Sequence, residues 1–122
     1  MSNSFNVLNN EIQEITADKS KELKSQIEEL FHSSKIVLFM KGNAQAPQCG
    51  FSANSVAILK HLGVSFKTFN ILNDSDIRQG LKEYSNWPTF PQLYINSKLI
   101  GGNDIITEMH QSGELNEYLK NN

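Results

Sequence analysis

The chain has 122 residues, of which 39% are hydrophobic and 20% charged, and this is the size and composition of one globular domain. Its net charge of −2 offers no basic surface for nucleic acid, and its longest apolar run, residues 36–40, is too short to cross a bilayer. Its single cysteine, Cys49, cannot form an internal disulfide, so we expect a reducing compartment: the cytoplasm, or the matrix of a mitochondrion or another organelle.

The N-terminal part combines a polar arm with the first two predicted elements. Residues 1–16 are rich in Asn and Ser, so we expect a flexible arm there and a folded domain over residues 17–122. From Asp18 onward, apolar residues recur with the spacing of one helix face. That face comprises Leu23, Ile27, Leu30 and Phe31. The apolar run from Lys35 to Met40 predicts a fully buried strand.

A loop, a second helix and a second strand follow. The loop, residues 43–48, leads to Cys49, and a helix is predicted from about Gly50 to His61. Gly63 is placed to end this helix, because glycine readily adopts the left-handed conformation of a C-terminal cap. Residues 65–71 are rich in Phe and Thr and predict a strand.

A third helix is predicted after that strand. Asp74 or Ser75 can serve as its N-cap, because a short polar side chain accepts hydrogen bonds from the first free N–H groups. Its apolar face consists of Ile77, Leu81 and Tyr84, which recur with helical spacing.

The C-terminal third is predicted to hold a hairpin and two helices. Residues 92–95 and 98–100 flank a two-residue polar turn, which is the pattern of a β-hairpin. Residues 101–104 open a helix that Gly113 ends. One more short helix is indicated by Leu115, Tyr118 and Leu119.

The predicted order is α-β-α-β-α-β-β-α-α. The strand–helix–strand unit implies a parallel pair of strands, and the hairpin adds antiparallel ones. Because the first strand is apolar on both faces, helices must cover both sides of the sheet. The fold class is therefore α/β, with a four-stranded mixed sheet flanked by helices on both faces.

Cys49 is the first candidate functional residue. It lies at the N-terminus of a predicted helix, where free N–H groups and the helix dipole stabilise a thiolate, and Lys41 adds a positive charge nearby. The alternative is an inert buried cysteine, but such a residue usually lies inside an apolar stripe and not in a loop between Pro47 and Gly50. The residues alone favour a reactive thiol and leave the alternative open.

Four motifs resemble those of the monothiol glutaredoxins of the Cys-Gly-Phe-Ser type. They are Phe-Met-Lys-Gly at 39–42, Cys-Gly-Phe-Ser at 49–52, the stretch over 77–94 that contains Trp-Pro-Thr-Phe-Pro, and Gly-Gly-Asn-Asp at 101–104. The similarity covers about residues 34–119, nearly all of the predicted domain. It implies a single glutaredoxin domain with the thioredoxin fold, which agrees with the order of elements above.

The resemblance also implies a groove for glutathione. Lys41 and Arg78 would bind its glycyl carboxylate, Arg78 in bidentate fashion, although a lone arginine on a helix is usually a solvated charge. Pro91 would follow a cis bond that turns the backbone of Phe90 toward the extended tripeptide; an ordinary trans proline is the alternative. The full set implied for glutathione is Lys41, Cys49, Phe51, Arg78, Phe90, Pro91, Gly102, Asn103 and Asp104.

The γ-glutamyl end of glutathione would lie at residues 102–104. Backbone N–H groups of Gly102 and Asn103 suit its carboxylate, and the Asp104 side chain suits its amine. Alternatively, Asn103 or Asp104 is an N-cap, and one residue can fill both roles. Asn103 stands where the family often has a small residue or a second cysteine, which excludes a regulatory internal disulfide.

The family further implies that Trp87 and Pro88 pack against the loop before Cys49. In that loop Gln48 stands where a basic residue is usual, so one activating charge is missing. Of the three histidines, none shares metal-ligand spacing with another, and we expect them at the surface.

The resemblance implies a 2Fe–2S cluster as cargo. Iron–sulfur clusters are commonly held by four thiolates, and one chain supplies only Cys49. A homodimer supplies two, and a glutathione beside each Cys49 supplies the other two. The cluster would then be passed to apo iron–sulfur proteins.

Two alternative functions remain open. In the first, Cys49 removes glutathione from proteins as a monothiol oxidoreductase, an activity we expect to be weak because Ser52 replaces a resolving cysteine. In the second, the protein is a regulatory adaptor that shares its cluster with a BolA-like partner. Neither alternative involves nucleic acid or a membrane.

Overall fold

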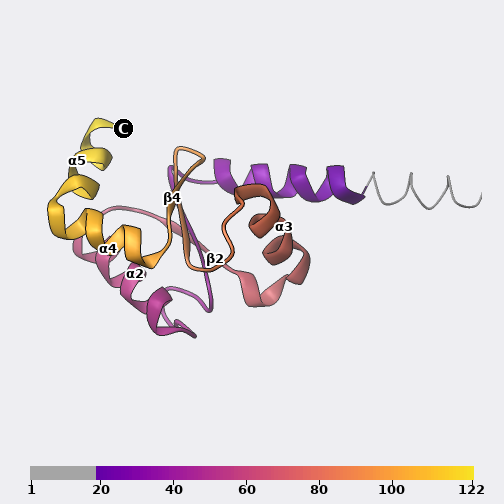
Figure 1. Cartoon of the computed structure of the whole chain (residues 1–122), viewed down its shortest axis with the longest axis horizontal. Coiled ribbons are helices and arrows are strands. Elements are labelled where there is room, and N and C mark those ends of the chain that lie inside the picture. Colours follow the sequence, from indigo (N-terminus) through magenta and orange to yellow (C-terminus); the bar gives the residue numbers. More distant parts are fainter. Residues whose placement is uncertain (1–18) are drawn as a thin grey trace, which may run out of the picture.

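The computed structural model describes residues 19–122, so the arm predicted over residues 1–16 lies outside the described part. A helix over residues 19–32 precedes the remaining elements (Figure 1). These are β1 (Ile36–Met40), α2 (Gly50–His61), β2 (Lys67–Asn70), the 3-10 helix η1 (Ile71–Asn73), α3 (Ser75–Ser85), β3 (Gln92–Ile95), β4 (Lys98–Gly101), α4 (Asn103–Ser112) and α5 (Glu114–Asn121). The order is the predicted one, with η1 in addition.

The strands form one four-stranded mixed sheet in the order β2-β1-β3-β4. β1 pairs with β2 in parallel and with β3 in antiparallel orientation, and β3 and β4 form the predicted hairpin. The hairpin turn has positive φ at Asn96 (51°) and Ser97 (66°), as tight turns of this kind require. The predicted α/β fold class is confirmed.

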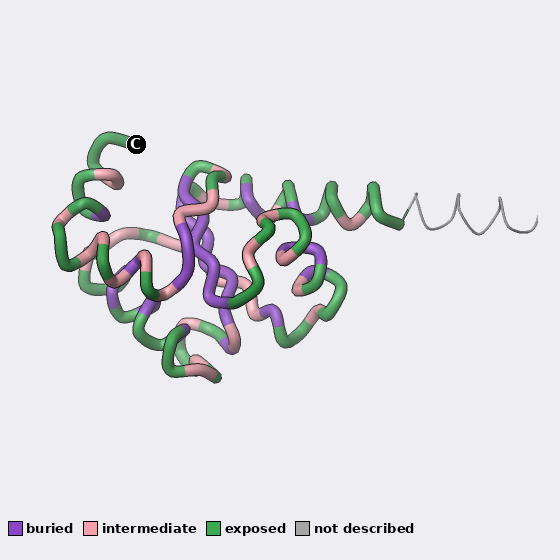
Figure 2. Tube along the Cα trace, in the orientation of Figure 1, coloured by how far each residue is buried: buried purple, intermediate pink, exposed green. Residues whose placement is uncertain are grey.

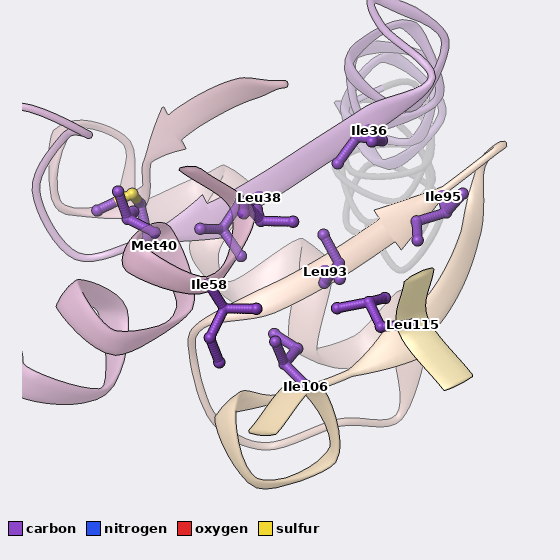
Figure 3. Packing of buried hydrophobic residues seen from close by; sticks show 10 residues of the cluster. Ile36, Leu38, Met40, Ile58, Leu93, Ile95, Ile106 and Leu115 are labelled. Atoms are coloured by element: carbon purple, nitrogen blue, oxygen red, sulfur yellow. The ribbon is translucent and has the colours of Figure 1, made fainter. Parts of the chain in front are cut away.

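The core is divided by the sheet into two layers, because successive side chains of a strand point to opposite faces. Ile36, Leu38 and Met40 of β1 pack on one face with buried residues of α2, α4 and α5 (Figure 3). Val37 and Phe39 pack on the other face with α3 and the helix over residues 19–32. Buried residues therefore follow the central strands, and helices lie on both sides of them (Figures 1 and 2).

Helices α2 and α4 lie side by side and run in the same direction. Asn54 near the start of α2 contacts Asn103 at the start of α4, and His61 at the end of α2 lies against His110 in the last turn of α4. The N-termini of the two helices therefore meet at one edge of the molecule. This edge holds the candidate site.

Two details differ from the sequence-based expectations. The second strand covers Lys67–Asn70 and not residues 65–71, because its pairing with β1 ends where Met40 meets Asn70 and the chain then turns into η1. Tyr84 lies on the apolar face of α3 as predicted, since its ring packs against Phe31 with centroids 5.3 Å apart, but it is 49% exposed and not buried like Ile77 and Leu81.

Other details agree with expectation. Of the two possible caps for α3, Asp74 is the N-cap, and its carboxylate accepts hydrogen bonds from the N–H groups of Asp76 and Ile77. Gly63 follows the C-cap of α2, and Gly113 is the C-cap of α4. Both have positive φ, as expected for glycines that end helices. Among the residues described, no helix has the length and apolar content needed to span a membrane.

Candidate functional site

Cys49 is the N-cap of α2 and has an extended backbone (φ −153°, ψ 138°). An N-cap normally carries an oxygen that accepts bonds from the first free N–H groups. No side-chain hydrogen bond caps α2 here, but the thiol lies close to the first free amides. The backbone N–H groups of Ser52 and Phe51 lower the pKa of Cys49 most, burial opposes them, and the charge of Lys41 and the Ser52 hydroxyl lower it by smaller amounts. Cys49 is free and only half-buried, which does not fit an inert core cysteine.

The end of β1 is tied to the first turn of α2 beneath the thiol. Ser52 is fully buried, and its Oγ accepts a hydrogen bond from the backbone N–H of Lys41 (3.2 Å). The N–H of Gly42 donates to Oδ1 of Asn70 on the neighbouring strand (3.0 Å). These bonds fix Lys41 close to Cys49, so its ammonium acts on the thiol.

The loop over residues 43–48 folds back on itself. Gln48 N–H donates to the carbonyl of Lys41 (2.8 Å), and Gly42 pairs with Pro47 across the loop. Gly42 has a φ of +89°, and a Cβ there would lie 2.5 Å from the Ala46 carbonyl oxygen, so only glycine fits this turn. The ends of the loop are thereby held together next to Cys49.

Helix α3 supplies two cations to the same region. Arg78 and Lys82 are four residues apart, so they lie on one face of the helix, and both are partly buried. Lys41 adds a third positive charge from the end of β1. This end of the site suits an anionic group.

The Phe90–Pro91 peptide bond is cis, as the resemblance implied. The segment before it is held down by Gln92, a fully buried residue whose Nε2 donates to the carbonyls of Trp87 (3.2 Å) and Thr89 (3.3 Å). Oε1 of Gln92 accepts from the hydroxyl of Tyr94 (2.9 Å), whose pKa is raised to about 12, chiefly by burial. This buried polar network could not be predicted from the sequence, because Gln92 occupies an ordinary strand position.

Helix α4 begins at Gly102, which is its N-cap, and no side chain caps the helix. The alternative in which Asn103 or Asp104 serves only as the N-cap is therefore wrong. A Cβ on Gly102 would lie 3.2 Å from Nε1 of Trp87 and 3.3 Å from the carbonyl oxygen of Pro91, so a side chain at 102 would crowd both. The first amides of α4 are left without a side-chain acceptor, and Asp104 adds an exposed carboxylate beside them.

These elements enclose a groove of about 470 Å³. All nine residues that the sequence pointed to line it: Lys41, Cys49, Phe51, Arg78, Phe90, Pro91, Gly102, Asn103 and Asp104. The lining residues that sequence reasoning left out of its ligand set are Lys82, Trp87, Pro88, Thr89 and Ile105. The spacing of Lys82 from Arg78 was a signal that could have identified it.

Trp87 has one feature that the sequence did not predict. Its indole packs over Gly102, and its Nε1 is buried with no hydrogen-bond partner among the described residues. The packing of Trp87 and Pro88 against residues 43–48 stays a prediction.

The described part of a single protomer holds no complete metal site. Within residues 19–122, no three His, Cys, Asp or Glu side chains gather in a way that could hold a metal ion. His61 and His110 pair with ring centroids 5.5 Å apart, but they lie at the opposite ends of α2 and α4 from the groove. Within the groove, the described ligand for a soft metal is the thiolate of Cys49.

Comparisons with known proteins agree on one family. Residues 36–100 match the glutaredoxin family model. The chain is 52% identical over 99 residues to an uncharacterized monothiol glutaredoxin of Synechocystis, covering 81% of this chain and 92% of the relative. It is 55% identical over 94 residues to a probable monothiol glutaredoxin 2 of Rickettsia conorii, covering 77% and 88%. Monothiol glutaredoxin-S17 of Arabidopsis is 54% identical over 98 residues, but these make up only 20% of that longer protein.

Solved structures give the same result. Reduced apo GrxS14 from poplar superimposes with a TM-score of 0.73 at 52% identity, covering 81% of this chain and 91% of that one. The holo form of glutaredoxin C1 from Populus gives a TM-score of 0.77 at 26% identity, covering 85% and 92%.

Proposed function

Because the chain belongs to the glutaredoxin family and has the single active-site cysteine of its monothiol members, we propose that it binds a 2Fe–2S cluster with the help of glutathione and passes it to apo iron–sulfur proteins. The observation that carries this proposal is the thiol of Cys49. It is half-buried, its pKa is lowered, and it lies in a groove whose two ends suit two carboxylates.

The groove fits glutathione in size and in charge. A volume of about 470 Å³ is within the usual range for small-ligand sites, roughly 300–1,000 Å³. Arg78, Lys82 and Lys41 would hold the glycyl carboxylate at one end. The uncapped amides of α4 would hold the γ-glutamyl carboxylate at the other end, with Asp104 facing its ammonium group.

The middle of the groove would orient the cysteinyl part of glutathione. The backbone of Phe90 precedes the cis bond and faces the groove, so it can pair with an extended peptide as an added strand would. The glutathione thiol then lies beside Cys49. This arrangement supplies two thiolates per protomer at one place.

A cluster ligated by four thiolates requires two such sites. We therefore propose a homodimer in which each protomer contributes Cys49 and one glutathione. Phe51 supports this, because it lies two residues from Cys49 on the rim of the groove and is 62% exposed, although it is a large apolar residue. A second protomer that covers the cluster would also cover this ring.

The monothiol oxidoreductase is the second candidate, and the lowered pKa of Cys49 is what favours it. The thiolate would attack the glutathione sulfur of a mixed disulfide, and the substrate protein would leave as a thiolate. A second glutathione thiolate would then attack the Cys49–glutathione disulfide, releasing glutathione disulfide and restoring Cys49. A role as an adaptor for a BolA-like protein rests on the family alone, and co-purification would test it.

The compartment is also a proposal. One Arabidopsis relative, monothiol glutaredoxin-S14, is named as chloroplastic. A labile thiolate-bound cluster requires reducing conditions, so we propose the cytoplasm or an organelle matrix.

Anaerobic reconstitution with iron, sulfide and glutathione tests the main proposal. We expect a brown dimer with about two irons per pair of chains, the number that four thiolates can hold in a 2Fe–2S cluster. Cys49→Ser should abolish both colour and dimerisation while the protein stays folded, because serine is a better N-cap than cysteine. Cluster binding by Cys49→Ser, or a coloured monomer, would contradict the proposal.

A further inference from the structure

We propose that Asn103 is a positioning residue that fixes the first turn of α4 against α2, and so sets the distance between the Cys49 thiol and the free amides of α4. The identity of the ligand that benefits, glutathione, rests on the proposed function. The spacing of the two helices is a property of the free protein and can be measured without that ligand.

Three hydrogen bonds join the two helices near the groove. Oδ1 of Asn103 accepts from Nδ2 of Asn54 (2.8 Å) and from the hydroxyl of Ser55 (3.1 Å). Nδ2 of Asn54 also donates to Oγ1 of Thr107, one turn further along α4 (3.0 Å). Both acceptor sites of the Asn103 oxygen are therefore used by α2.

The Asn103 side chain is available for this contact because Gly102 takes the N-cap position. An asparagine at an N-cap would direct its oxygen to the first amides of its own helix. At position 103 the oxygen reaches α2 instead, so the first amides of α4 stay open to a ligand. Glycine at position 102 and asparagine at position 103 together leave the first amides of α4 free and anchor the helix that carries them.

The contact resists displacement of one helix along the other. Ser55 is fully buried, and separation of the helices would leave its hydroxyl without this partner in a desolvated place. The first turn of α2 carries the thiol and the first turn of α4 carries the free amides, so a ligand that touches both depends on their spacing. Misplacement by about 1 Å at such a site can cost roughly a hundredfold in rate.

The decisive variant is Asn103→Ala, which removes the contact and leaves the backbone N–H of residue 103 in place. We expect glutathione affinity, measured by calorimetry, to fall about three- to tenfold, the loss typical of one or two hydrogen bonds. Ser55→Ala should act in the same direction, and the double variant should be no weaker than Asn103→Ala, because both substitutions break one contact. The pH dependence of Cys49 alkylation should not change, since the pKa of that thiol is lowered chiefly from within α2.

A matched control separates positioning from general destabilisation. Ser112→Ala removes the hydrogen bonds to the Met109 carbonyl and from the Glu114 amide at the far end of α4, away from α2, and should bind glutathione as the wild type does. Thr107→Val, which cuts only the second bond of Asn54, should weaken binding less than Asn103→Ala. Unchanged affinity in folded Asn103→Ala, or losses that multiply in the double variant with Ser55→Ala, would overturn the proposal.

A measurement on the free protein keeps this test apart from the proposed function. NMR amide shifts and hydrogen exchange of the first α4 turn should change in Asn103→Ala and return toward wild type in Asn103→Asp, which keeps the acceptor oxygen. If the wild type binds no glutathione, the proposed function fails, and these spectra alone then test whether Asn103 positions the first turn of α4. Identical spectra for Asn103→Ala and the wild type would then overturn the positioning role.

Discussion

The thiol of Cys49 stands where a capping oxygen is usual at the start of α2, without making a capping hydrogen bond, and this position accounts for much of its chemistry. The backbone amides of Phe51 and Ser52 would otherwise be satisfied by a capping side chain, and here they stabilise the thiolate. Ser52 acts twice: its amide lowers the pKa of Cys49, and its buried hydroxyl accepts from the Lys41 amide. One residue therefore couples the state of the thiol to the end of β1.

Replacing Ser52 with Ala should raise the pKa of Cys49, because the hydroxyl contribution is lost and Lys41 is held less firmly. The change should be small, since the Ser52 amide, the largest cause of the lowered pKa, remains. The rate of alkylation by iodoacetamide against pH measures it: the wild-type midpoint should lie below that of an ordinary cysteine, and the variant's midpoint should move up toward the ordinary value. Ser33→Ala, whose hydroxyl bonds only within its own helix turn, is the control. A midpoint that stays put or falls in Ser52→Ala would show that the hydroxyl has no part in thiol activation.

The elements differ in how well their sequence defines them. The start of α3 was predictable because the Asp74 side chain, which is local to the helix, is of a type that caps helices. The continuous apolar run identified β1. The end of β2 was not predictable, because it is decided by where β1 ends and not by the residues after Asn70. The contacts between α2 and α4 likewise depend on how two helices that are far apart in the sequence align in space, and no local sequence pattern predicts that alignment.

The same distinction holds for the groove. The nine residues identified from the motifs line it, because the motifs carry their own spacing. Lys82 lines the groove because it lies on the same face of α3 as Arg78. Thr89 lines it because of the path that the chain takes before Pro91. The orphaned Nε1 of Trp87 and the buried network around Gln92 became visible only with the three-dimensional packing.

The cap of α3 supports a prediction about stability. Asp74→Ala removes the acceptor for the amides of Asp76 and Ile77, and should lower the free energy of unfolding by about 1 kcal/mol, within the usual range of roughly 0.5–2 kcal/mol. Urea unfolding followed by circular dichroism measures the loss. Asp74→Asn keeps a capping oxygen and should stay close to the wild type. An equal loss in both variants would assign the effect to the charge of Asp74 and not to its hydrogen bonds.

Across the whole molecule, the groove lies at the carboxyl end of the central strand β1, and the two apolar layers lie behind it. Four separate segments reach this region: the end of β1, the start of α2, one face of α3, and the chain from Trp87 to the start of α4. The fully buried side chains belong mainly to the two core layers, so most groove residues can be replaced without opening the core. This separation makes functional tests on the intact protein informative.

The balance between cluster carriage and thiol–disulfide exchange is a property of the assembled site. The only cysteine is Cys49, and the loop over residues 43–48 closes beside it through the Gln48–Lys41 hydrogen bond. We expect this loop to hold bound glutathione in a pose suited to ligation and away from the in-line geometry of exchange. Turnover of a glutathione mixed disulfide, coupled to glutathione reductase, should then be about a hundredfold slower than for a dithiol glutaredoxin, the cost of misplacement by about 1 Å. Equal turnover at equal concentration would favour the oxidoreductase over the carrier.

Deleting residues 43–48 tests whether the loop sets that balance. The two ends of the loop lie near each other, because Gln48 N–H donates to the Lys41 carbonyl (2.8 Å), so the shortened chain has only a short gap to close. Without the loop, bound glutathione should reach the in-line geometry of exchange more easily. It should also be held less firmly in the pose in which its thiol ligates the cluster. Turnover should therefore rise and the half-life of the reconstituted cluster should fall together. Thermal stability should fall modestly, because the deletion removes Ala44, which packs against the apolar layer on the α2 side of the sheet. A change in only one of the two activities would show that the loop does not couple them, and that the pose of glutathione is set by α3 and α4 instead.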